Sequence, residues 1–170
     1  TLKLTRCIVR LKLIQILIMK KLLLLLFFLP NLALSETIAT CENPQGYAYF
    51  PFSGNAPEAD SGWFTDGFTG GVYRLTQDDN GNFDVIFTGK GGQFISAIQD
   101  GGSVAPFSYD ENQISILVLY MGSVVETFSF IKNNEGNNEL ILTQTKTKIF
   151  PKAASYRAKC SQLDLYKINI

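Results

Sequence analysis

Histidine is absent from the 170-residue sequence, and its absence excludes several classes of functional site. A Ser-His-Asp triad, a histidine general base, a histidine-ligated zinc ion and a histidine-ligated haem all need imidazole. The sequence also lacks a P-loop, a dinucleotide-binding fingerprint and a CxxC pair. These absences predict no metal and no organic cofactor, and they favour a protein that is not an enzyme.

Acidic residues are missing from the first 35 positions. Six of the 15 basic residues precede position 22, whereas all 15 acidic residues lie from Glu36 onward. The chain after residue 35 therefore has nine basic and 15 acidic residues, a net charge of −6. Such a surface does not favour the phosphate backbone, so we expect no nucleic-acid partner.

No apolar run reaches the roughly 20 residues that a membrane-spanning helix needs. The longest, Leu22–Leu34, has 13 residues and is interrupted by Pro30 and Asn31. A basic start at Met19 and a small-x-small end at Ala33–Ser35 complete the pattern of a secretory signal peptide.

The sequence therefore predicts a signal peptide over residues 19–35, with no transmembrane anchor left after cleavage. Residues 1–18 are interpreted as upstream sequence or an extended basic region, and residues 36–170 as one exported domain. The predicted location is the periplasm or the outside of the cell. As an alternative, Ile38–Cys41 looks like a lipidation box, which would make Cys41 the anchor of a lipoprotein; Thr40 fits that box poorly.

Cysteine is scarce, with three in the chain. Cys7 lies in the leader, which leaves Cys41 and Cys160 in the exported part. Two cysteines in an exported domain, one near each end, predict a single Cys41–Cys160 disulfide.

After residue 35 the chain consists of aromatic and β-branched runs separated by Gly, Asn and Asp, and it shows no convincing helical period. We expect strands at residues 46–52, 71–78, 83–89, 93–99, 103–108, 113–120, 123–131, 138–147 and 154–160. The predicted fold class is all-β, an antiparallel meander of about eight or nine short strands, closed as a small barrel or folded as a two-layer sandwich.

Asn80-Gly81 predicts a tight two-residue hairpin turn, because both residues tolerate positive φ. Pairing across that turn places Arg74 opposite Phe87, on an apolar face.

Glu126 lies in an apolar row with Val124, Phe128 and Phe130 on the strand at 123–131. An inward Glu126 and an inward Arg74 have three interpretations. In the first, they form a buried or half-buried structural ion pair, or they are charges at strand ends that reach water. In the second, they provide the polar centre of a ligand-holding β-barrel. In the third, Glu126 is the acid of a carboxylate-dependent glycan hydrolase. The hydrolase would need a second carboxylate, for which Asp66 and Asp84 are candidates by residue type.

The segment 61–71 holds three aromatic residues and four glycines. We interpret it as a loop over the open end of the sheets, with Trp63 as a plug of the core. The alternative is a binding loop in which Trp63, Phe64, Asp66 and Phe68 form a stacking platform for a sugar or an interaction hot spot.

Five of the nine basic residues in the exported part lie close together near its C-terminus: Lys146, Lys148, Lys152, Arg157 and Lys159. We expect a solvated surface there, with an anionic partner as the alternative. Taken together, the sequence favours a small exported binding or structural domain without catalytic activity, whose partner is a surface glycan or an envelope protein.

Overall fold

The computed structural model describes residues 35–53, 57–89, 91–148 and 150–169. Residues Leu34–Ile170 form one compact unit, and the predicted signal peptide at residues 19–35 lies almost wholly outside the described residues. The described residues contain no helix with the length and hydropathy of a membrane span.

The predicted all-β antiparallel fold is confirmed: the described residues form one ten-stranded sheet in the order β5-β4-β3-β1-β10-β9-β8-β7-β6, with β2 also paired to β1. The strands are β1 (Glu36–Phe50), β2 (Gly62–Gly67), β3 (Val72–Gln77), β4 (Phe83–Thr88), β5 (Phe94–Ser96), β6 (Ser103–Tyr109), β7 (Gln113–Tyr120), β8 (Val124–Lys132), β9 (Asn138–Lys146) and β10 (Lys152–Leu163). Short 3₁₀ turns, η1 (Glu58–Asp60) and η2 (Leu165–Lys167), accompany them.

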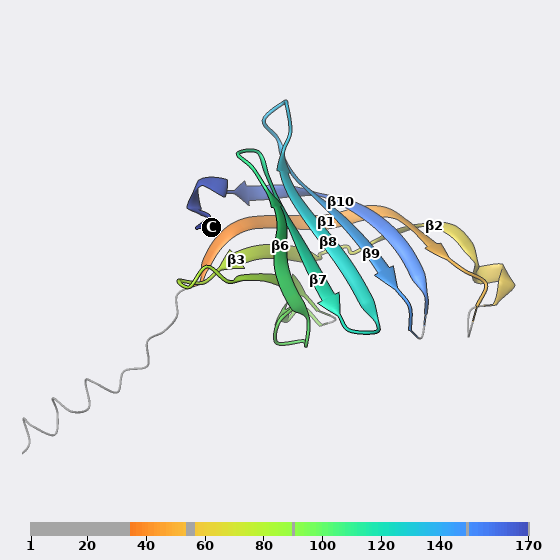
Figure 1. The fold of residues 1–170 in the computed structure, drawn as a ribbon. Helices are drawn as coiled ribbons and strands as arrows, with labels where there is room; N and C mark the ends of the chain where they lie inside the picture. Colours follow the sequence, from red (N-terminus) through yellow and green to blue (C-terminus); the bar gives the residue numbers. More distant parts are fainter. Residues whose placement is uncertain (1–34, 54–56, 90, 149, 170) are drawn as a thin grey trace, which may run out of the picture. The chain divides into compact units, whose positions relative to one another are not determined.

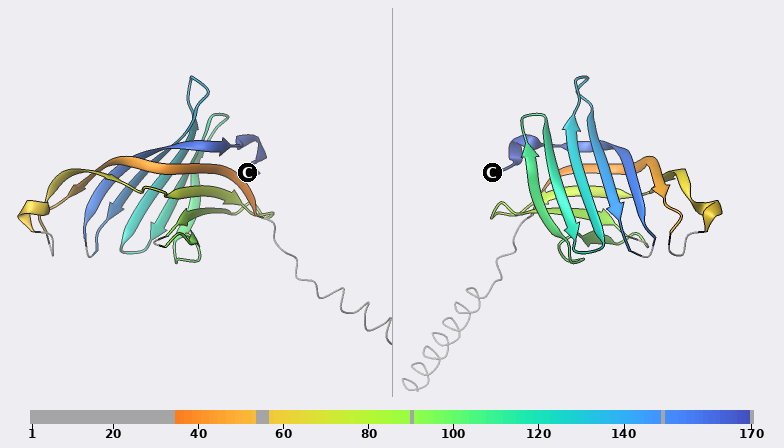
Figure 2. Two further views of the ribbon diagram at one scale, coloured as in Figure 1. Left: turned by 180° about the vertical axis from the view of Figure 1, so that it is seen from behind. Right: turned by 45° about the vertical axis from the view of Figure 1, so that its right-hand side comes forward.

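The sheet curls into a half-barrel (Figure 1). Strands β6–β9 form one wall, the long β1 and β10 form the roof, and β3–β5 form the opposite wall (Figure 2). β4 and β6 stand far apart in the hydrogen-bonded order, yet they come into contact with each other because the sheet curls. One curled sheet therefore encloses a core without being a closed barrel.

Strand alternation explains the core. Alternate residues in the middle of β7, β8, β9 and β10 are buried on the concave face, as Ile114, Ile116 and Val118 show on β7. The β8 and β9 residues that face them include Phe128 and Leu142. Removal of this apolar surface from water is the main stabilising contribution to the fold.

β1 changes its hydrogen-bonding partner in mid-strand. On the edge that faces away from β10, its first half pairs with β3 and its second half with β2. On the other edge, the register of its pairing with β10 shifts between Glu42 and Gln45. At this bulge Asn43 adopts a positive φ of 52°, and its side-chain oxygen accepts a hydrogen bond from Gly70 N at 2.7 Å. Phe68 N donates to Pro44 O at 2.9 Å. The bulge therefore fixes the loop between β2 and β3 against the sheet.

The predicted disulfide is confirmed: Cys41 and Cys160 are bonded, and they lie directly opposite each other on β1 and β10. The sulfur atom that lipidation of Cys41 would use is thus part of the disulfide. A cross-link of this kind is typical of proteins in oxidising compartments.

The predicted register of the first hairpin was wrong by one residue. Asp78 N bonds Asn82 O at 2.9 Å, so the turn holds the three residues between them and not two. Gly81 adopts a φ of 83° at the third turn position, and the Asp78 carboxylate accepts from Asn80 N and Asn82 N. Arg74 consequently lies opposite Ile86, while Tyr73 lies opposite Phe87.

Candidate ligand-binding pocket

A pocket of about 1070 Å³ opens at one end of the half-barrel. The strand ends and turns that line it come from the β2–β3 loop, the β4–β5 hairpin, the loop before β6, the β7–β8 hairpin and the facing ends of β9 and β10. Its size is at the upper end of the range of small-molecule sites.

The predicted position of Glu126 is confirmed on β8. Phe128 and Phe130 of the same face are buried in the core, and Glu126 is the next inward residue toward the pocket, which it lines. Gln144 of β9 lies directly opposite Glu126, and its Nε2 donates a hydrogen bond to Glu126 Oε1 at 2.5 Å. The second carboxylate oxygen has no hydrogen-bond partner among the described residues.

Burial raises the pKa of Glu126 above its ordinary value. The hydrogen bond from Gln144 and the positive charge of Lys152 oppose this rise in pKa, and the charge of Asp100 adds to it. Glu126 is therefore a poorly solvated carboxyl group. The hydrogen bond and the positive charge that the protein supplies do not fully offset the cost of ionising it.

Two tyrosines beside Glu126 are perturbed in the same way. Burial, with the charge of Glu126 second, raises the pKa of Tyr73 well above its usual range. Burial, Glu126 and then Asp100 and Asp84 raise the pKa of Tyr120 to about 12. Both phenols line the pocket as neutral groups, and neither hydroxyl makes a side-chain hydrogen bond within the described residues.

Four aromatic residues form part of the pocket wall. Phe68 and Phe87 line it together with Tyr73 and Tyr120. Tyr73 packs on Phe128 of the core with ring centroids 5.6 Å apart, and on Phe87 at 6.4 Å. The rings of Tyr73 and Phe87 are thus held by packing on the core and not by loop contacts alone.

A polar cluster of Asp66, Tyr156 and Lys152 borders the pocket. The Tyr156 hydroxyl donates to Asp66 Oδ2 at 2.7 Å and accepts from Lys152 Nζ at 2.9 Å, and Lys152 forms an ion pair with Asp66 at 3.1 Å. Burial would raise the pKa of Asp66. The hydrogen bonds that Asp66 accepts from Tyr156 and Lys152, together with the charge of Lys152, outweigh burial and hold the pKa below its usual range. Asp66 is therefore a structural counter-ion of Lys152.

The structure does not bring Arg74 to Glu126. The one-residue change of register turns Arg74 to the outer face, where its guanidinium lies over the ring of Phe94 at 4.3 Å. These two residues, both described by the structure, therefore do not form the expected ion pair.

Trp63, Phe64 and Asp66 lie on strand β2, not in a loop, whereas Phe68 lies in the loop that follows and lines the pocket. Trp63 is 69 % exposed, so the expectation of a core plug was wrong. The physical reason is that β2 pairs along the far half of β1 and extends beyond the core, with Trp63 on the outer face opposite Tyr49.

The carboxylates proposed for hydrolysis are occupied elsewhere. Asp84 accepts a hydrogen bond from the Ser96 hydroxyl at 2.5 Å, and Asp66 is held by Lys152 and Tyr156. Asp100 lines the pocket with Glu126, and sequence reasoning missed it because it is a turn residue after a short strand. Among the described residues no group of three or more Cys, Asp or Glu side chains is placed to hold a metal ion.

Comparison with protein-family models, with curated proteins and with solved structures finds no match for this chain.

Proposed function

We propose that this protein is an exported binding domain whose half-barrel mouth holds a small organic molecule with a cationic group. The observation that carries the proposal is Glu126, a half-buried carboxylate that lines a pocket of about 1070 Å³ and has no ion-pair partner among the described residues. Lys152, whose positive charge favours the ionised form of Glu126, is already bound to Asp66. A ligand cation would supply the missing counter-charge.

The aromatic residues of the pocket support the same ligand class. Phe68, Tyr73, Phe87 and Tyr120 line the same pocket as Glu126. Organic ammonium groups bind to carboxylates surrounded by aromatic rings, because the ring faces attract a cation that has little hydration to lose. The disulfide between β1 and β10 supports export, since such bonds persist in oxidising compartments.

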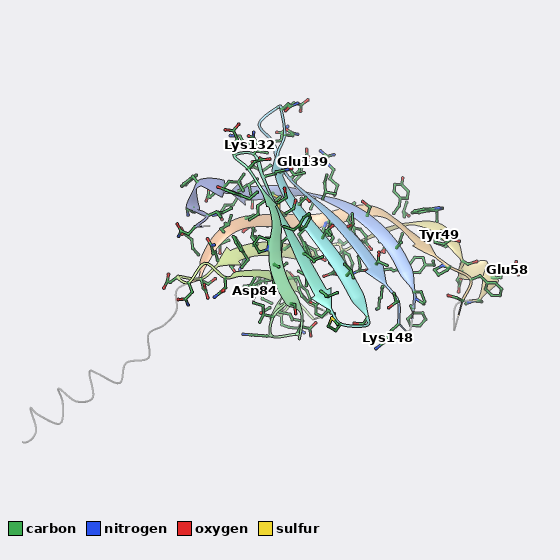
Figure 3. All side chains as sticks on the ribbon, viewed as in Figure 1. Tyr49, Glu58, Asp84, Lys132, Glu139 and Lys148 are labelled. Atoms are coloured by element: carbon green, nitrogen blue, oxygen red, sulfur yellow. A yellow bond between two sulfur atoms is a disulfide. The ribbon has the colours of Figure 1, made fainter. Side chains whose placement is uncertain are left out.

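Choline, a quaternary ammonium compound, is a suitable first probe. We expect calorimetric titration to detect binding at millimolar or lower concentration, and Glu126→Gln to weaken it about tenfold or more while the protein remains folded. Glu139→Gln is the matched control, because Glu139 lies at the opposite end of the sheet and pairs with Arg157 (Figure 3). Absence of choline binding, or equal binding by Glu126→Gln, would contradict the proposal.

A second candidate function is binding of a surface glycan on the outer face. Tyr49 and Trp63 lie opposite each other there with ring centroids 5.4 Å apart, and they are 41 % and 69 % exposed. Two rows of uncharged residues continue from this pair across the sheet in register. They are Thr65, Tyr47, Ser155, Thr143 and Thr127, and Trp63, Tyr49, Ala153, Thr145 and Val125.

Exposed rings flanked by hydroxyls are suited to stacking and hydrogen bonding with neutral sugar rings. Retention on immobilised polysaccharide that is lost in Trp63→Ala and kept in Glu126→Gln would support this second function. Equal retention of Trp63→Ala and the parent protein would remove it.

A further inference from the structure

The pocket that contains Glu126 has a second, oppositely charged pole at its rim. Lys146 at the end of β9 and Lys152 at the start of β10 lie directly opposite each other, and both line the pocket. Lys148, in the turn between these strands, lines it as well, and Figure 3 shows it at the lower end of the sheet. Like charges directly opposite in a sheet are destabilising, so this arrangement has a cost in the empty protein.

Among the described residues, one of these amines has an acidic partner. Lys152 pairs with Asp66 at 3.1 Å. Lys146 and Lys148 form no ion pair with any described residue. Lys148 Nζ reaches the β7–β8 hairpin, where it lies 3.6 Å from the position that a Cβ on Gly122 would occupy. Two ammonium groups without counter-ions therefore stand at the opening of the pocket.

The two poles are close in the sheet. Glu126 lies opposite Gln144, and Val124, two residues earlier on the same face, lies opposite Lys146. Glu126 and Lys146 are thus diagonal neighbours, which lie about 7–8 Å apart in a regular antiparallel pair, with their Cβ atoms somewhat closer. They do not form an ion pair in the structure. A small molecule can therefore contact both, with one end at the carboxylate and the other at the rim.

We infer that the ligand of this pocket is a zwitterion, with an ammonium group directed inward to Glu126 and an anionic group, phosphate or carboxylate, held at the rim by Lys146 and Lys148. The inference rests on the proposed function and extends it from one charged group of the ligand to two. A simple cation would leave the rim amines uncompensated, and a simple anion would leave Glu126 uncompensated. Only a ligand with both charges complements both poles.

Phosphocholine, choline and inorganic phosphate are the probes that separate these cases. We expect phosphocholine to bind about tenfold more tightly than choline, and inorganic phosphate to bind more weakly than either. Lys146→Gln with Lys148→Gln should remove the advantage of phosphocholine and leave choline affinity within about twofold. High salt should reduce the same advantage, because the rim is exposed to solvent. Lys132→Gln, on an exposed lysine at the opposite end of the sheet, is the control (Figure 3).

Each outcome has a distinct meaning. If choline binds in a Glu126-dependent way but phosphocholine binds no more tightly, or keeps its advantage in the double lysine variant, the zwitterion inference is wrong and the proposed function stands. If choline binding does not depend on Glu126, or no ammonium compound binds, the proposed function fails and the inference fails with it. Vesicles of phosphatidylcholine, compared with free phosphocholine, tell a lipid headgroup from a soluble ligand: tight binding to vesicles alone would overturn a small-molecule ligand.

Discussion

Glu126 occupies a position at which the alternation of β8 would otherwise place an apolar residue. Its neighbours on the inward face, Phe128 and Phe130, are buried, and the residue opposite is Gln144. A single hydrogen bond from an amide offsets only part of the cost of taking a carboxylate out of water. Such a residue lowers the stability of the empty protein, which is a common property of binding sites.

The raised pKa of Glu126 gives a pH-dependent prediction. Because the unfolded chain ionises this group at a lower pH than the folded protein does, folding carries no penalty below the ordinary pKa of 4.5. The penalty grows as the pH rises above that value and is complete once the pH exceeds the folded-state pKa. We expect Glu126→Gln to be more stable than the parent by about 0.5–2 kcal/mol at pH 7, and the difference to shrink toward pH 4.

Denaturant unfolding at the two pH values measures this difference. Glu139→Gln is the comparison, because hydrogen bonds from Arg157 lower the pKa of Glu139, so that its replacement is expected to give no gain in stability at pH 7. A Glu126→Gln protein that is less stable than the parent at pH 7 would show that the carboxylate is a structural partner and not a site residue.

At the scale of elements, the sequence predicted the strands whose apolar and polar residues alternate regularly. The strands from β3 to β10 were placed within a few residues, and the inward face of β8 was placed correctly, because their apolar residues alternate between turns rich in Gly and Asn. β2 was missed because Trp63, Phe64 and Thr65 are all exposed, so that a strand with both faces in water leaves no alternation to detect.

The register of a hairpin was the step at which the site prediction failed. Asn80-Gly81 marks a turn, but whether that turn holds two or three residues depends on the side chain of Asp78, which accepts two backbone hydrogen bonds across it. One residue of difference exchanges the two faces of a strand. The three-residue turn places Arg74 on the outer face and Tyr73 in the pocket. No local sequence pattern distinguishes this register from the one with a two-residue turn.

The pairing of β1 with β10 gives a second prediction, on Gly46. A Cβ added at Gly46 would lie 1.9 Å from the carbonyl oxygen of Ser155 on β10. The two strands would have to separate, so we expect Gly46→Ala to destabilise the fold by about 2–3 kcal/mol. Ser155→Ala, at an exposed side chain on the same strand pair, should change stability by less than about 0.5 kcal/mol. Thermal melts that show equal stability for both variants would contradict the close approach.

At the scale of the whole molecule, β1 and β10 are the central pair of the sheet, and they carry the disulfide. One edge of the half-barrel is built outward from β1 through β3 and β4, the other from β10 through β9 to β6. The cross-link thus joins the two strands from which both walls extend.

Loss of the disulfide is the third prediction. Cys41 and Cys160 are 119 residues apart in the sequence, and the chain-entropy model gives a stabilisation of about 4–5 kcal/mol for a loop of that length. Cys41→Ala with Cys160→Ala should therefore lower the free energy of unfolding by that amount, which lowers the denaturant midpoint. Reductant should lower the midpoint of the parent protein without affecting the double variant. Equal midpoints for the parent protein with and without reductant would contradict a stabilising role.

The most direct test of the account is to locate the bound ligand by NMR amide shifts during titration with phosphocholine. The half-barrel site predicts the largest changes at Glu126, Gln144, Tyr73 and Tyr120, with none at the indole of Trp63, the one tryptophan of the chain, which lies on the outer face. Changes confined to Trp63 and Tyr49, or no changes at saturating phosphocholine, would contradict a ligand site at the mouth of the half-barrel.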